Sequence, residues 1–399
     1  MKKSLFAIAA VTAFAGAAQA QSSVTVYGLM DVGYTGGNAR VATPAGVSKE
    51  TVNRISNSME SGSRLGFRGN EDLGGGTSAQ FVFELGINPA GDNMSNTWTP
   101  NIRQGFAGLT QKGMGNVRIG TQNSLYWEQG NNMTGQLAQT AGSMLAPSVV
   151  GASFLQSNTD NGSFSPAYTV RTANTIRLST ERMAGFTVKG AYTLSNSNRN
   201  QVNNTAPVQG YTQGTNDQDG YQIGVDYTFK KALVQASYAT FTSDNPYTAT
   251  AAQAALGTGS VGAPVAWTPT GGTNVKDNQM LVTASYDFGI LRAYAGYTNR
   301  KVTSGINSNA FLKRTAQEIG VRSMITPKIE GWASVGNGRF TSFGTSNPTA
   351  NITGYQVGSN YLMSKRTNLY AIYGANQTSS TTVGSSGLNQ YSLGVRHTF

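Results

Sequence analysis

The sequence predicts an all-β fold, a sixteen-stranded antiparallel β-barrel that spans a membrane. Three observations support this prediction. Many segments of about ten residues alternate apolar with polar side chains, the weak signature of a membrane-spanning barrel. The connections between these segments alternate between short and long along the chain. The composition is rich in glycine and tyrosine, and only 12% of the residues are charged, which suits a barrel better than a soluble enzyme.

Residues 1–20 are predicted to be a secretory signal peptide. Lys2-Lys3 gives a charged start, Leu5 to Ala15 an apolar run, and Ala18-Gln19-Ala20 a small-x-small cleavage site. We expect residues 21–399 to form one barrel domain, because no linker-like change of composition divides them. The chain has no cysteine, so disulfides and thiolate chemistry are excluded.

Sixteen segments of the chain alternate and end in turn residues. They are Val24 to Tyr34, Met59 to Gly69, Thr77 to Ile87, Asn101 to Thr110, Gly115 to Thr121, Thr172 to Glu181, Phe186 to Ser195, Gly220 to Phe229, Ala232 to Thr242, Asn278 to Phe288, Leu291 to Lys301, Thr315 to Met324, Ile329 to Phe340, Ile352 to Tyr361, Thr367 to Gln377 and Asn389 to Phe399. An even number of strands with one polar face lets the sheet close, so that no backbone edge is left unpaired in lipid. The polar face then lines the lumen.

The connections support the same fold. Short ones include Lys230-Lys231 and Gly289-Ile290, and long ones include Asn196 to Asp219 and Ser243 to Asp277. Short turns on one side and long loops on the other are typical of outer-membrane barrels. Seven aromatic residues are expected near strand ends, where amphipathic rings favour the water–lipid boundary: Tyr27, Trp98, Tyr192, Tyr227, Tyr286, Tyr361 and Phe399.

The stretch Gln122 to Arg171 differs from the rest of the chain, because it has no sustained alternation and lies between two predicted strands. Loops of this length are usually functional or disordered. We expect this one, residues 122–171, to fold into the barrel lumen and narrow it.

Several motifs resemble those of the general porins of β-proteobacteria, the Burkholderia, Bordetella and Neisseria type. They are Ser23 to Gly28, Ser63 to Gly69 followed by Glu71 to Gly76, Arg103-Gln104, and the ending Gly394 to Phe399. The resemblance implies a homotrimer of sixteen-stranded barrels in the bacterial outer membrane, in contact with its lipid and lipopolysaccharide, each narrowed by its third external loop. Phe399, an aromatic last residue, resembles the assembly signal of such proteins. Family members often carry Gly-Arg-Gln at Gly120-Thr121-Gln122, so one arginine is missing here.

Charged residues of the predicted pore are placed by strand parity. Arg64 and Arg68 alternate with Leu65 and Phe67, which predicts that both arginines point inward. The same argument applies to the further arginines Arg118, Arg171 and Arg177. Arg103 is less clear, because Ile102 and Phe106 both suggest lipid on their side, but the family resemblance implies an inward side chain. Arginine on the lipid side would cost about 2 to 4 kcal/mol at the midplane.

Acidic residues are expected to face these arginines. Glu84 opposes Phe83 and Leu85 on its strand, and the long loop supplies Glu128 and Asp160. Rings of arginine favour anions in a pore, so the sequence predicts a mild anion preference. The alternative is that the arginines are solvated wall charges that help strand pairing.

The sequence fits other classes of function less well than a pore. His397 is the chain's only histidine and shares the parity of Leu393, which places it outside the lumen and excludes a histidine-based triad. The sequence indicates no metal site, cofactor or nucleic-acid partner. A channel specific for a small anionic solute would need an aromatic pocket, for which the loop offers Tyr126, Trp127, Phe154, Phe164 and Tyr168. These rings would equally serve to pack the loop against the wall, and an adhesin or phage-receptor role of the long loops could coexist with a pore. We expect passive diffusion of small hydrophilic solutes and ions.

Overall fold

The computed structural model describes residues 23–43, 46–57, 59–90, 101–134, 170–199, 214–244, 275–304, 311–342, 349–380 and 384–399. They form a sheet of seventeen strands and the helix α2. No helix among these residues is long and apolar enough to cross a membrane.

The elements follow one another along the chain with short turns between many of them. They are β1 (Ser23–Thr43), β2 (Gly46–Asn57), β3 (Arg64–Gly74), β4 (Thr77–Gly86), β5 (Asn101–Gln111), β6 (Gly115–Asn123), α2 (Leu125–Thr134), β7 (Arg171–Thr180), β8 (Phe186–Arg199), β9 (Gly214–Phe229), β10 (Ala232–Asp244), β11 (Val275–Asp287), β12 (Arg292–Ser304), β13 (Phe311–Thr326), β14 (Ile329–Ser342), β15 (Thr349–Leu362), β16 (Thr367–Ser380) and β17 (Gly384–Thr398).

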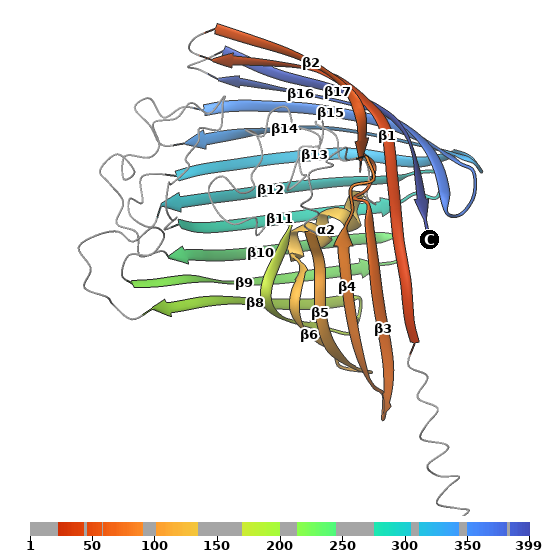
Figure 1. The fold of residues 1–399 in the computed structure, drawn as a ribbon, viewed down its shortest axis with the longest axis vertical. Helices are drawn as coiled ribbons and strands as arrows, with labels where there is room; N and C mark the ends of the chain where they lie inside the picture. Colours follow the sequence, from red (N-terminus) through yellow and green to blue (C-terminus); the bar gives the residue numbers. More distant parts are fainter. Residues whose placement is uncertain are drawn as a thin grey trace, which may run out of the picture.

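The sheet closes into an antiparallel barrel. From β3 to β17 each strand pairs with the next along the chain, and β17 returns to pair with β1, which Figure 1 shows as blue strands beside the red one. β2 pairs with β1 between Val32 and Thr43, whereas β3 pairs with it between Ser23 and Leu29. β2 and β3 therefore occupy the same position in the barrel wall, beside successive parts of β1. Counted in this way, the barrel has the sixteen strands that the sequence predicts.

The two faces of the wall differ as expected. Large apolar side chains such as Ile223, Val357 and Leu393 are exposed on the outer face. Polar side chains at alternate positions, such as Gln222 and Gln356, are buried on the inner face. Because residues of a strand point alternately to its two faces, a polar lumen and an apolar outer surface follow from one period-two pattern.

All sixteen predicted segments overlap strands, but many of their ends differ, mostly on the side of the long connections; at a short turn, β3 continues to Gly74 where the prediction ended at Gly69. β1 continues to Thr43, where the prediction ended at Tyr34, and β9 begins at Gly214 instead of Gly220. β2 was not predicted at all, and the segment predicted to start at Met59 becomes a strand only at Arg64.

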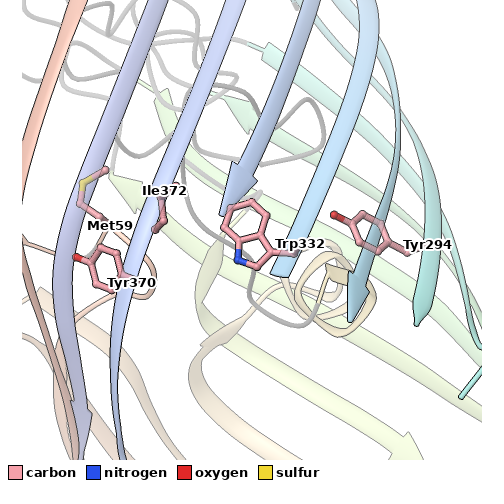
Figure 2. Packing of buried hydrophobic residues seen from close by; sticks show 5 residues of the cluster. All are labelled: Met59, Tyr294, Trp332, Tyr370 and Ile372. Atoms are coloured by element: carbon pink, nitrogen blue, oxygen red, sulfur yellow. The ribbon is translucent and has the colours of Figure 1, made fainter. Parts of the chain in front are cut away.

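The break between β2 and β3 turns inward. We call residues 59–63 the inward segment; its members Met59, Glu60, Ser61 and Ser63 are buried. Figure 2 shows Met59 near Tyr370 and Ile372 of β16, with Trp332 of β14 and Tyr294 of β12 further along the inner wall. The Trp332 ring lies over Gly358 of the next strand, where a Cβ would be only 2.2 Å from the ring.

Candidate functional site

Glu84 lies at the centre of a group of arginines on the inner wall. Its carboxylate accepts a hydrogen bond from Arg103 Nε at 2.7 Å and one from the Tyr27 hydroxyl at 3.1 Å. Arg64 Nε lies 3.6 Å from the same carboxylate, and Arg171 is within electrostatic range of it. The neighbouring strands β1, β3, β4 and β5, with the first residue of β7, thus bring these side chains to one sector of the lumen.

Arg68 extends this group along β3. Its guanidinium carbon lies 5.4 Å from the centre of the Tyr27 ring, a cation–π contact. Tyr27 was predicted at the lipid boundary, and that prediction is wrong for this residue. Its neighbour Val26 is exposed on the outer face, so alternation alone sends Tyr27 inward.

A β-bulge explains the ambiguous parity of Arg103. β4 and β5 change register between Glu84 and Leu85, which pair with Gln104 and Ile102 and leave Arg103 as the extra residue. Bulges of this kind re-aim a side chain. Arg103 therefore points inward to Glu84 although Ile102 is exposed outside. Phe106 is buried, with the Arg118 guanidinium carbon 5.2 Å from its ring centre, so it does not face lipid as its parity had suggested.

Glu128 of α2 organises a second charged group. Arg177 Nη2 donates to one of its oxygens at 2.6 Å, and Lys189 Nζ donates to the other at 2.7 Å. Lys189 also donates to Asp226 at 2.5 Å. Burial opposes ionisation of Glu128, but Arg177 and Lys189 outweigh it and hold the pKa of this carboxyl below its ordinary value of 4.5. Arg118, whose register partner is Arg177, lies within electrostatic range of both Arg177 and Glu128.

The two groups present opposite charges to the lumen. Around Glu84 the arginine side chains are the more exposed, 20% for Arg64 and 18% for Arg103 against 7% for Glu84. Around Glu128 the carboxylate is the more exposed, 29% against 6% for Arg177 and 7% for Lys189. An ion in the lumen would therefore meet arginine at the first group and a carboxylate at the second.

The helix α2 holds the second group against the wall. Ser124 caps its first turn, accepting a hydrogen bond from the Trp127 N–H at 3.0 Å. The helix packs on β9 to β12 (Figure 1). The Leu125 N–H donates to Gln222, and Gln129 donates to Asp226. The sequence pattern predicts a loop without a helix over residues 122–171, so α2 is a difference from the prediction. A capping serine, Ser124, followed by an acidic residue in the first turn, Glu128, is the sequence signal for this helix.

Tyr126 packs the helix against the wall. Its ring is buried and its hydroxyl shares a 2.7 Å hydrogen bond with Thr298 of β12. This contact favours the packing role over an aromatic pocket for this residue. Asp160, Phe154, Phe164 and Tyr168, which the prediction also named, lie outside the described residues, as does Trp98.

Sequence reasoning missed some members of both groups. Tyr27, Lys189 and Asp226 make direct contacts to the predicted residues but were not predicted as site residues. Lys189 alternates with Val188, so its parity was available as a signal. No group of three or more potential metal ligands occurs in the described part of the chain.

Phe399 completes the closure of the barrel. Its N–H donates to the Gly28 carbonyl at 3.1 Å, and the Gly28 N–H donates to its carbonyl at 3.0 Å. The ring lies on the outer face over Gly28, where a Cβ would be 2.2 Å from it. The last residue therefore joins the first strand directly.

A closed barrel with an apolar outer face and a charged lumen defines a transmembrane β-barrel channel. The chain belongs to the Gram-negative porin family, whose model matches residues 7–382. Membership of this family places the chain in the bacterial outer membrane and confirms the prediction of a channel protein rather than an enzyme.

Relatives of known name agree with this family. The chain is 26% identical to an outer membrane porin protein of Bordetella pertussis over the whole of both proteins. It is 42% identical to outer membrane porin protein 32 of Delftia acidovorans over 30% of this chain and 31% of that protein. It is 37% identical to major outer membrane protein P.IB of Neisseria gonorrhoeae over 33% of this chain and 35% of that protein.

Solved structures share the fold. An anion-selective porin from Comamonas acidovorans superimposes with a TM-score of 0.65 at 18% identity, over 95% of this chain and all of that one. The trimer form of OmpT from Vibrio cholerae has a TM-score of 0.60 at 15% identity, over 95% of this chain and 99% of that one.

Proposed function

We propose that this porin allows passive diffusion of small hydrophilic solutes and ions across the outer membrane, with a mild preference for anions. The observation that carries the preference is the group around Glu84, where Arg64, Arg68, Arg103 and Arg171 accompany one carboxylate. Partly exposed arginines lining a pore attract anions and repel cations. The anion-selective porin of Comamonas acidovorans, which has the same fold, supports this direction.

The loop 122–171 is proposed to form the constriction. The support is its first part, where α2 bonds to buried inner-face residues of β9 and β12. Glu128 then stands as the acidic side of the constriction, and Arg64 and Arg103 as the basic side. Two further elements of the proposal are a signal peptide over residues 1–20 and a role of Phe399 in assembly.

A homotrimer surrounded by outer-membrane lipid and lipopolysaccharide is proposed as the working form. The trimer form of OmpT, a protein of the same fold, supports it. Cross-linking of the protein in native outer membrane is expected to give a species of three chains, and a species of one chain only would contradict this.

Liposome swelling tests passive diffusion. Purified protein in liposomes should admit neutral sugars at rates that fall with solute size and rise linearly with concentration. Rates that saturate with one small anionic solute, and competition by its analogues, would instead support a substrate-specific channel.

A further inference from the structure

The inward segment is an insertion in the barrel wall. β1 changes partner from β2 to β3 between Val32, opposite Asn57, and Leu29, opposite Arg64. Between these two pairings β1 has only Met30 and Asp31, whereas the other side of the ladder has the whole connection from Asn57 to Arg64, which contains the inward segment. Extra residues in an antiparallel pair must leave the ladder, and such departures commonly lie next to functional sites.

Asp31 fixes the backbone of this segment. One oxygen of its carboxylate accepts the N–H of Glu60 at 2.8 Å and that of Ser61 at 2.7 Å. The other oxygen accepts the Tyr370 hydroxyl at 2.6 Å. Asp31 is fully buried, and its own N–H donates to the Ser63 hydroxyl at 2.9 Å. Charge-assisted bonds to a buried carboxylate hold their donors in one geometry.

Glu60 connects the inward segment to the last three strands of the barrel. Its carboxylate accepts from Asn360 of β15 at 2.8 Å and from Asn368 of β16 at 2.9 Å, and Arg396 of β17 lies 3.4 Å away. Met59 adds apolar contact with the cluster of Figure 2. The inward segment is therefore held by β1 on one side and by strands β15 to β17 on the other.

At Gly62 the inward segment contacts Arg64 and Arg103, the two arginines that pair with Glu84. The Gly62 carbonyl accepts a hydrogen bond from Arg64 Nη1 at 2.9 Å. The guanidinium of Arg103 lies against Gly62 itself, because a Cβ built there would be 2.8 Å from Arg103 Nη1 and 3.4 Å from its central carbon. Any side chain at position 62 would displace the Arg103 guanidinium, which is the flexible end of a long side chain.

We propose that the inward segment positions Arg64 and Arg103 and that Gly62 is a specificity-determining residue of the channel. Glu84 holds these arginines from one side. Gly62 supplies the opposite surface, and Asp31 and Glu60 keep that surface in place. This inference rests on the proposed function, because it explains what holds in place the arginines that are proposed to set the ion preference.

The test is a double-mutant cycle on ion selectivity. Gly62→Ala is expected to lower the anion-to-cation permeability ratio by up to about twofold, the effect of moving one charge in a watery pore, while single-channel conductance stays near that of the wild type. In the Arg103→Ala background, Gly62→Ala is expected to have no further effect. Gly190→Ala is the matched control, because within the described part of the chain, the two adjacent residues aside, no atom lies within 4 Å of a Cβ at Gly190.

An equal shift with and without Arg103, or no shift at all in Gly62→Ala while Arg103→Ala does shift selectivity, would overturn the inference. Asp31→Asn provides a second variant that places an amide donor against the segment's N–H groups, and it should shift the ratio in the same direction. The proposed function is tested by a different result. A wild-type zero-current potential whose sign shows cation preference would contradict the proposed function, whereas the inference about Gly62 depends only on the difference between variants.

Discussion

Replacing both Arg64 and Arg103 by alanine is expected to lower the anion preference of the channel about fivefold. The two side chains are the exposed partners of Glu84, which is itself nearly buried. Their loss removes two positive charges from the lumen and leaves the Glu84 carboxylate with the Tyr27 hydroxyl as its remaining hydrogen-bond donor among those described above. Both changes favour cations.

The magnitude follows from Coulomb's law in water. One charge about 8 Å from the path of an ion changes its energy by about 0.5 kcal/mol, and salt at about 0.1 M reduces this to about 0.2 kcal/mol. Two such charges act on anions and cations with opposite signs, so the permeability ratio changes by about 1 kcal/mol in all, which is about fivefold.

The assay is the zero-current potential across a planar bilayer under a salt gradient. The matched control is Lys328→Ala with Lys365→Ala, which removes the same charge from exposed turns outside the lumen and should leave the ratio nearly unchanged. A potential that is the same in the arginine variant and the wild type would refute the reasoning, as would an equal shift in the control.

Three further predictions concern the second group, the chain end and the outer face. Glu128→Gln should raise the anion preference about twofold. Because the folded pKa of Glu128 is lowered, acidifying the wild type should approach the same value only well below pH 4.5. The stabilising contribution of the Glu128 carboxylate is fully present above pH 4.5 and is lost as the pH falls through the lowered pKa. A shift toward cations in either experiment would contradict this. Deletion of Phe399 removes two backbone hydrogen bonds to Gly28 and should reduce the folded fraction on heat-modifiable gel mobility, whereas Phe399→Tyr should fold normally; normal folding of the deletion would count against an assembly role. Val357→Arg, on the outer face, should destabilise the barrel by about 2 to 4 kcal/mol in urea unfolding from lipid vesicles, and Asn70→Arg, an exposed residue on the inner face of β3, should cost much less; equal costs would show that Val357 does not face lipid.

The strands could be predicted because lipid and water act on opposite sides of the wall and impose a period of two on the sequence. Beyond the membrane this constraint ends. β9 begins with Gly214-Thr215-Asn216-Asp217, which has no apolar alternation, and β2 reads Gly46–Asn57 with mostly exposed residues. Their strand conformation comes from pairing with β8 and β1, which the sequence pattern does not record.

The site was only partly predictable for a related reason. Parity placed Arg64 and Glu84 correctly, since each lies on a regular strand. It failed for Arg103, because a bulge breaks the alternation without a mark in the sequence. Contacts between distant residues, such as Lys189 with Glu128 and Tyr370 with Asp31, depend on the closure of the barrel and could not be inferred from either segment alone.

The measurement to make is the zero-current potential of the wild-type protein in a planar bilayer with a tenfold gradient of potassium chloride, recorded together with single-channel steps. We expect conductance in steps of three and a potential whose sign shows a modest excess of chloride permeability. A potential of the opposite sign would contradict the proposal that arginines around Glu84 govern ion passage, and an absence of conductance would contradict the diffusion pore itself.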